Sequence, residues 1–197
     1  MITMHKLLSI VACAGLVAAT LPARALSLVS TTANGNRVAA SVAASPLPTI
    51  AADIGFADWN AVSLVFELSA NDADGLAAFN AVIANSTTGR GLTALELTLD
   101  RGSFAQVGNV TPAFGAIAAL VGDGQRQRIS FEPAEHFGVD LGNPFATPGQ
   151  ADWLLGLSGL QPGERFTLTV SAVPEPGGLV LALLGIGVLA TRRFARA

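Results

Sequence analysis

The 197-residue sequence has no tyrosine, one cysteine and two histidines. Cys13 lies in an N-terminal apolar run, so the rest of the chain cannot form a disulfide, a thiolate zinc site or a cysteine nucleophile. His136 is the only histidine beyond the N-terminal segment, which excludes metal motifs built from two histidines there. These absences remove several large classes of enzyme and metalloprotein.

Positive charge is also scarce. Lys6 is the only lysine, and residues 26–173 carry 13 Asp and Glu side chains against six arginines, a net charge of about −7. No nucleic-acid partner is expected, because phosphate backbones are bound by clustered basic surfaces. The 148 residues between the terminal segments are enough to bury a core without a metal or a disulfide.

The N-terminal segment has the organisation of a secretory signal peptide. Lys6 supplies a basic region, residues 7–21 form an apolar stretch, and Ala23 and Ala25 supply the small side chains that signal peptidase requires. We expect residues 1–25 to form a signal helix that is removed after Ala25. The alternatives are a retained anchor, although a 15-residue helix reaches only ~22 Å across a core of ~30 Å, and a lipoprotein box at Cys13, although the apolar run before it is short.

Three features follow one another at the C-terminal end. A Pro-Glu-Pro segment precedes an uncharged, largely apolar run over residues 177–190, and three arginines follow it: the residues concerned are Pro174, Glu175, Pro176, Arg192, Arg193 and Arg196. The prolines favour extended backbone, and the run spans ~21 Å as a helix, enough to enter a locally thinned bilayer. Because arginine is costly to translocate, we expect the basic end of this hydrophobic helix to remain cytoplasmic.

This order resembles the PEP-CTERM sorting domain over about residues 173–197. The resemblance implies recognition by an exosortase, a membrane-embedded cysteine transpeptidase-like enzyme, with cleavage near the Pro-Glu-Pro segment, in a Gram-negative host that makes exopolysaccharide. It also implies that Pro174, Glu175 and Pro176 are the recognition segment and that the three arginines are the stop signal. No LPxTG motif precedes the apolar run, which disfavours a sortase signal. A permanent single-span anchor is the alternative.

Residues 26–172 have the pattern of an all-β domain. Alternating apolar and polar residues predict strands at 62–68, 92–99, 128–132 and 166–170, with weaker candidates at 26–30, 37–43, 104–107, 117–121 and 153–157. A period of two with a polar outer side is typical of antiparallel sheets. Eight to ten short strands predict an antiparallel β-sandwich, jelly-roll-like in size. One short helix is predicted at 74–85, where Leu76, Phe79, Val82 and Ile83 share a helical side after the capping residue Asp74.

Few residues of the body suggest chemistry, so we expect no enzyme and no cofactor. An acidic cluster of Glu132, Glu135, His136 and Asp140 is the best candidate for acid–base catalysis, but the surrounding glycines and prolines indicate a segment whose carboxylates are solvated. Asp72 and Asp74, followed by Gly75, are weak candidates for a calcium site, although EF-hand spacing fails. Trp59 and Trp153 are candidates for stacking on sugars, with a place in the core as the plainer interpretation.

The sequence therefore predicts an exported cell-surface or extracellular-matrix protein that passes through an inner-membrane intermediate. Its expected role is non-catalytic, structural or adhesive, and linked to exopolysaccharide. The alternatives are a secreted hydrolase and a small carbohydrate- or calcium-binding module. The expected partners are signal peptidase, an exosortase-like membrane peptidase and exopolysaccharide.

Overall fold

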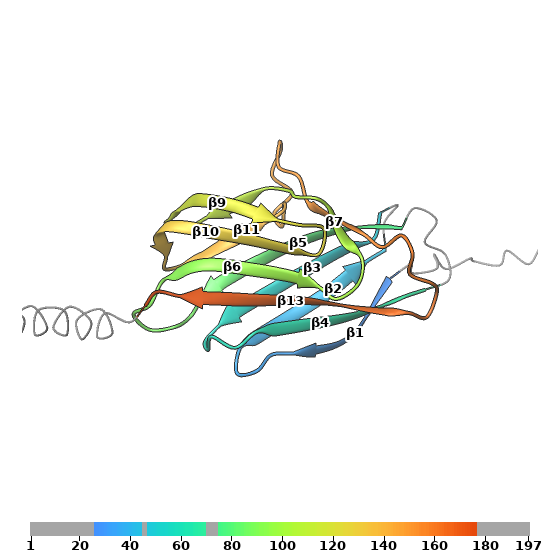
Figure 1. The fold of residues 1–197 in the computed structure, drawn as a ribbon, viewed down its shortest axis with the longest axis horizontal. Coiled ribbons are helices and arrows are strands. Elements are labelled where there is room, and N and C mark those ends of the chain that lie inside the picture. Colours follow the sequence, from blue (N-terminus) through green and yellow to red (C-terminus); the bar gives the residue numbers. More distant parts are fainter. Residues whose placement is uncertain (1–25, 45–46, 70–74, 177–197) are drawn as a thin grey trace, which may run out of the picture.

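Two layers of β-strands make up the computed structural model, which describes residues 26–44, 47–69 and 75–176 (Figure 1). These residues form thirteen strands and no helix. The all-β prediction is therefore confirmed, with more strands than the eight to ten expected. The predicted signal helix and the predicted hydrophobic helix over 177–190 lie outside the described residues.

The first sheet has six antiparallel strands in the order β1-β4-β13-β6-β10-β9. Buried and more exposed residues alternate along β4, β6 and β13, as predicted. This period of two places one side of the sheet against a core and the other in water. The strand bounds are β1 Leu26–Thr32, β4 Val62–Leu68, β13 Arg165–Pro174, β6 Leu92–Leu99, β10 Arg126–Glu135 and β9 Ala116–Gly122.

The second sheet is centred on β5 and runs in the order β2-β3-β5-β11-β8, with β12 also paired to β5, and β7 paired to β12. β3 and β5 are parallel, so the prediction of a wholly antiparallel body is wrong at this pair. The strand bounds are β2 Arg37–Ala43, β3 Thr49–Phe56, β5 Leu76–Asn85, β11 Gly138–Leu141, β8 Val110–Pro112, β12 Trp153–Gly156 and β7 Ser103–Gln106.

Both sheets contribute to one hydrophobic core. Phe66 and Phe166 are cross-strand partners on β4 and β13, and their rings stack with centroids 5.3 Å apart. Burying a side chain of this size contributes about 1.5–3 kcal/mol. The largest fully buried side chains include Trp153, Phe56, Phe66, Phe79 and Phe166. Apolar burial between the two layers is thus the main stabilising interaction.

The helix predicted at 74–85 is wrong, because Leu76–Asn85 forms strand β5. Phe79 and Ile83 face the core, while Ala78 and Asn80 on the other side of the strand are buried as well. A central strand that is covered on both sides has an almost continuous apolar sequence. Such a sequence contains helical spacings by chance, which is why the helical periodicity misled the prediction. Asp74 itself lies outside the described residues.

Besides β5, three strands form where none was predicted, namely β3, β8 and β11. β3 does alternate, with Ile50, Ile54 and Phe56 on the buried side, but the two adjacent alanines, Ala51 and Ala52, weaken the contrast between its sides. β8 has three residues and β11 has four, so both are too short to show a period. They form because β5 pairs with β3 and with β11, and β11 in turn pairs with β8. All the weaker strand candidates are confirmed to within two residues, as β1, β2, β7, β9 and β12.

The first and last strands leave the first sheet at opposite ends (Figure 1). Leu26, at the start of β1, pairs with Leu68, and β13 begins beside it where Arg165 pairs with Glu67. β13 then runs to the other end of the sheet, where Pro174 pairs with Leu92. Residues 1–25 and 177–197 therefore attach at opposite ends of the body, which we call the Leu26 end and the Pro174 end.

Candidate functional site

The outward side of the second sheet consists of small side chains with a few polar ones among them. Strand register places Asp53 of β3 and Asp140 of β11 on either side of Val82, and Thr111 of β8 next to Asp140. Small side chains leave the backbone near the surface, so an extended ligand can approach it closely. We call this surface the second-sheet face; it consists of Ala39, Ser41, Ala51, Asp53, Asn80, Val82, Ala84, Thr111 and Asp140.

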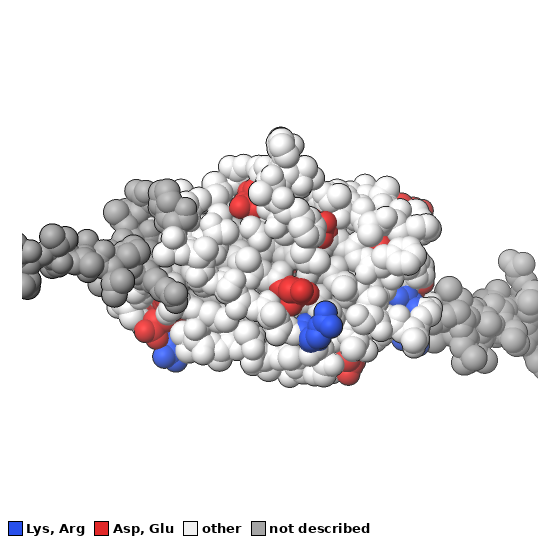
Figure 2. All heavy atoms as spheres, turned by 180° about the vertical axis from the view of Figure 1, so that it is seen from behind, with Lys and Arg blue, Asp and Glu red and all other residues white. Residues whose placement is uncertain are grey.

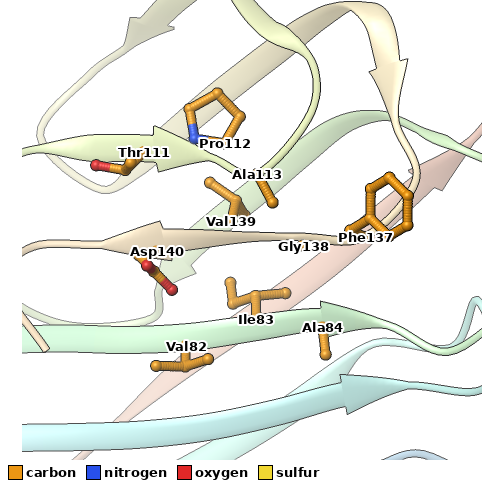
Figure 3. A pocket seen from close by; sticks show the side chains of 10 residues that line it. All are labelled: Val82, Ile83, Ala84, Thr111, Pro112, Ala113, Phe137, Gly138, Val139 and Asp140. Atoms are coloured by element: carbon orange, nitrogen blue, oxygen red, sulfur yellow. The ribbon is translucent and has the colours of Figure 1, made fainter. Parts of the chain in front are cut away.

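Two shallow hollows adjoin on the second-sheet face. The first, of about 270 Å³, lies across β5, β11 and β8, with Asp140 towards one end and Phe137 at the other (Figure 3). The second, of about 300 Å³, lies across β2, β3 and β5 and is lined by Asp53 and Asn80 among others. Val82 lines both hollows, so they adjoin at this residue, and we call the two hollows together the track.

Asp140 is the only charged side chain that lines the first hollow. Burial raises the pKa of its carboxyl above the ordinary value, because the partly desolvated site favours the neutral form. Figure 2, which shows the side of the molecule opposite to Figure 1, has few charged side chains on a mostly uncharged surface, and an acidic and a basic group adjoin near its centre. Such a surface suits hydrogen bonding to a neutral, hydroxyl-rich ligand better than binding to a polyanion or a polycation.

Asp152 fixes one margin of this track. Its Oδ1 atom accepts hydrogen bonds from the backbone N–H of Asn143, at 2.7 Å, and from the side-chain amide of Asn80, at 3.2 Å. Asn143 and Asp152 lie in the loop between β11 and β12, and Pro144 of the same loop lines the second hollow. The loop is thereby held against the second-sheet face by a side chain of that face, Asn80.

The acidic cluster considered for catalysis does not converge. Glu132 is exposed on β10, Asp140 lies on the second-sheet face, and Glu135 is fully buried. The expectation of solvated carboxylates in this segment is therefore wrong for Glu135. His136 is exposed and packs edge-on against the ring of Phe114, with centroids 6.1 Å apart.

Glu135 uses both carboxylate oxygens to organise two turns. Oε2 accepts hydrogen bonds from the backbone N–H groups of Phe114 (2.7 Å) and Gly115 (2.8 Å), and Oε1 accepts them from Phe137 (2.8 Å) and Gly138 (3.1 Å). Burial alone raises the pKa of this carboxyl, but the four hydrogen bonds outweigh it and lower the pKa below the ordinary value. Sequence alone does not indicate this role, because one of the two turns, the turn before β9, lies 20 and 21 residues before Glu135 in the chain.

The two tryptophans take different positions. Trp153 is completely buried, meets the ring of Phe104 edge-on at 5.7 Å, and donates from Nε1 to the carbonyl of Asn109 at 3.1 Å. It is therefore a core residue and does not provide a stacking surface. Trp59 is half-buried and packs against the core.

The predicted sorting segment begins inside the last strand. β13 extends to Pro174, two residues beyond the predicted end of the body at residue 172. Glu175 is then held by two hydrogen bonds to Gly91: its N–H donates to the Gly91 carbonyl (3.0 Å), and its Oε2 accepts from the Gly91 N–H (3.2 Å). Pro176 is exposed. The other predicted positions lie outside the described residues: Ala23, Ala25, Asp72, Asp74, Arg192, Arg193 and Arg196.

Across residues 26–44, 47–69 and 75–176, no three His, Cys, Asp or Glu side chains come together in a way that could hold a metal ion. The same ranges contain no helix that is long and apolar enough to cross a membrane. No protein-family model, curated protein or solved structure matches this chain.

Proposed function

We propose that the chain is an exported cell-surface or extracellular-matrix protein whose C-terminal segment directs its sorting, and whose body has a non-catalytic structural or adhesive role linked to exopolysaccharide. The observation that carries the proposal is the fixed order of Pro-Glu-Pro, apolar run and terminal arginines over residues 174–196, in a chain that also begins like a signal peptide. This order is the one that resembles a PEP-CTERM sorting signal, with an exosortase-like peptidase as its reader.

The arrangement of the body is consistent with such a role. The two layers are best classed as a β-sandwich of jelly-roll-like size, and their terminal segments leave at opposite ends. A signal peptide at one end and a sorting tail at the other can therefore be processed without disturbing the core. A signal peptide followed by a C-terminal sorting tail is the basis for proposing export through an inner-membrane intermediate to the envelope or the exterior.

The second-sheet face is the surface we assign to exopolysaccharide. Its shallow track, its single carboxyl in the first hollow and its small side chains suit contacts spread along a neutral glycan chain. No nucleic-acid partner is proposed, because three of the six arginines of the body already pair with glutamates, as Arg101–Glu164, Arg126–Glu96 and Arg165–Glu67.

The non-catalytic assignment rests on the separation of the acidic residues. A general acid–base pair needs two carboxyl groups that flank one substrate bond, whereas both oxygens of Glu135 are engaged by backbone donors inside the protein. Glu132 and Asp140 lie on different sheets. The acidic residues singled out for catalysis therefore do not form such a pair.

Replacing the Pro-Glu-Pro segment tests the sorting assignment. We expect a chain with Pro174, Glu175 and Pro176 changed to alanine to accumulate in the inner membrane with its tail uncut, visible as a larger band on immunoblots. The control changes Gln161 and Pro162 to alanine, at the Leu26 end of the body. Equal processing of the two variants would remove the sorting assignment.

Co-sedimentation with host exopolysaccharide tests the binding face. Ser41→Arg places a large charged side chain on the second-sheet face and should weaken binding at least tenfold. Ser171→Arg, an outward position on the first sheet, is the matched control and should bind like the parent chain. Equal binding by both variants would assign the glycan, if bound, to another surface.

A further inference from the structure

The Pro174 end of the body carries a cluster of exposed aromatic side chains. Phe114 is 57% exposed and Phe137 is 66% exposed, and their rings meet edge-on with centroids 6.0 Å apart. The ring of His136 also packs edge-on against Phe114. We call these three residues the aromatic cluster. Exposed apolar groups of this kind, gathered in one place, indicate a contact surface.

The aromatic cluster is held rigidly. The backbone N–H groups of Phe114 and Phe137 both donate to the buried carboxylate of Glu135, one to each oxygen. Two turns from different parts of the sequence are therefore fixed relative to each other, and they present their rings on the same side. Because the backbone of both turns is already fixed, a partner that covers the rings does not have to order it.

The cluster lies next to the point where the C-terminal segment leaves the body. Glu175 is bonded to Gly91 through two hydrogen bonds. A Cβ atom on Gly91 would come within 2.7 Å of the Ala134 Cβ and 3.0 Å of the His136 Nε2, so only glycine fits between the tail and the cluster. The exposed residues of this end include Arg90, Glu132 and Pro133.

Only a short stretch of chain separates Glu175, which is hydrogen-bonded to Gly91, from the apolar run. The run begins at Gly177, two residues after Glu175, and two extended residues span at most about 7 Å. If residues 177–190 enter a bilayer, the Pro174 end must lie at its surface. Aromatic side chains are favoured in the interfacial region of a bilayer, where an apolar ring can be partly withdrawn from water.

We infer that the aromatic cluster rests on the lipid bilayer that the apolar run enters, so that Phe114 and Phe137 hold the body against the membrane surface with its Leu26 end outermost. This inference rests on the proposed function in one respect, the insertion of residues 177–190. It adds an orientation for the membrane-bound intermediate. It also places the Pro-Glu-Pro segment at the membrane surface, bound to the body by Glu175.

Site-directed bimane labels on the mature chain, which begins at Leu26 and has no cysteine of its own, test this orientation. Single cysteines are placed at His136 (in the cluster), Gln161 (at the Leu26 end) and Leu184 (in the apolar run). Each labelled protein is reconstituted in phosphatidylcholine vesicles whose acyl chains are brominated near the headgroup. We expect strong quenching at 184, quenching at 136 several-fold greater than at 161, and little at 161.

Phenylalanine variants show whether the rings make the contact. In the chain labelled at 136, Phe114→Ser with Phe137→Ser should lower lipid quenching at least twofold. Phe145→Ser is the matched control, because Phe145 is 68% exposed but lies in the loop beyond the other end of β11. Thermal melting of each variant confirms that the body is folded, and the label at 136 in the unsubstituted chain tests the orientation independently of these variants.

The outcomes separate the inference from the proposed function. Quenching at 184 with none at 136 would overturn the membrane contact and leave tail insertion intact. An absence of quenching at 184 would overturn the insertion and the contact together. Protection of the 136 label from water without lipid quenching, in particles of twice the expected mass, would assign the cluster to a second copy of the chain and overturn the inference.

Discussion

The backbone N–H of Phe114 donates a 2.7 Å hydrogen bond to the carboxylate of Glu135, a fully buried acid 21 residues further along the chain. Three further backbone groups bind the same carboxylate. A buried charge is tolerated only when it is well hydrogen-bonded, so this acid must have a structural role. It joins the turn that precedes β9 to the turn that follows β10.

Replacing Glu135 by glutamine should therefore destabilise the body markedly. Glutamine has one acceptor oxygen and an NH2 group, so at least two of the four backbone donors lose their partner. Each unsatisfied buried donor costs about 1–3 kcal/mol, and we expect a loss of about 2–4 kcal/mol in the free energy of unfolding. Urea denaturation measures it.

Glu132→Gln is the control for that substitution, because Glu132 lies on the same strand and is exposed. A change at such a surface position should remain within about 0.5 kcal/mol. Equal stability of the Glu135 and Glu132 variants would show that the carboxylate is not needed to hold the turns.

The hydrogen bonds of Glu135 also predict loss of stability in acid. Its pKa in the folded protein lies below the ordinary value of 4.5, so its contribution is complete above about pH 4.5 and is lost as the pH falls through the folded-state pKa. Unfolding measured from pH 6 to pH 2.5 should show a steeper decline for the parent chain than for Glu135→Gln. Parallel curves for the two proteins would contradict this origin of the acid sensitivity.

Asp140 behaves in the opposite sense. Burial raises its pKa in the folded protein above the ordinary value of 3.8, so ionisation penalises the fold as the pH rises from that value through the folded-state pKa. Asp140→Asn should therefore raise stability at pH 7 by roughly 0.5–1 kcal/mol and converge with the parent chain near pH 3. Asp53→Asn, at an exposed position on the same face, should change little.

A gain in stability on Asp140→Asn would indicate that the carboxyl of Asp140 is kept for binding and not for folding. A partly desolvated carboxyl that destabilises the fold is typically retained for what it binds. Asp140→Asn should then weaken co-sedimentation with exopolysaccharide while it raises the melting temperature. Unchanged binding would show that the first hollow does not contribute to the glycan surface.

Substitution of Trp153 tests whether this residue belongs to the hydrophobic core or to a glycan-binding surface. Trp153→Phe removes the hydrogen bond to Asn109 and leaves a cavity among buried neighbours, and we expect it to cost about 2–4 kcal/mol. Glycan binding by the folded variant should be unchanged. Trp59→Phe, at a half-buried site, should cost less than about 1.5 kcal/mol. Loss of glycan binding in folded Trp153→Phe would contradict the assignment of this residue to the core.

The sequence predicts those strands that have one side in the core and the other side exposed to solvent. Ile129 and Phe131 on β10, and Phe166 and Leu168 on β13, alternate with polar residues, and both segments were predicted. The same reasoning fails for β5, because residues 77–81 are buried on both sides of the strand, and Leu76, Phe79, Val82 and Ile83 fit a helical period equally well. Short strands such as β8 depend on partners that lie far away in the sequence.

The candidate site was less predictable than the fold. Asp140 was singled out as an acid, but its place beside Val82 and Asp53 depends on a parallel pairing that local sequence does not encode. Glu135 was grouped with its chain neighbours, whereas its partners in the turn before β9 come from 20 residues away. The aromatic cluster likewise joins residues 114 and 137 through tertiary contacts alone.

Mass spectrometry of both chain ends, on protein from fractionated host cells, tests the central claim most directly. The account predicts a first residue of Leu26 and a chain in the envelope or medium that has lost the peptide containing Arg192, Arg193 and Arg196. A cytosolic chain that retains both Met1 and those three arginines would contradict export and sorting together.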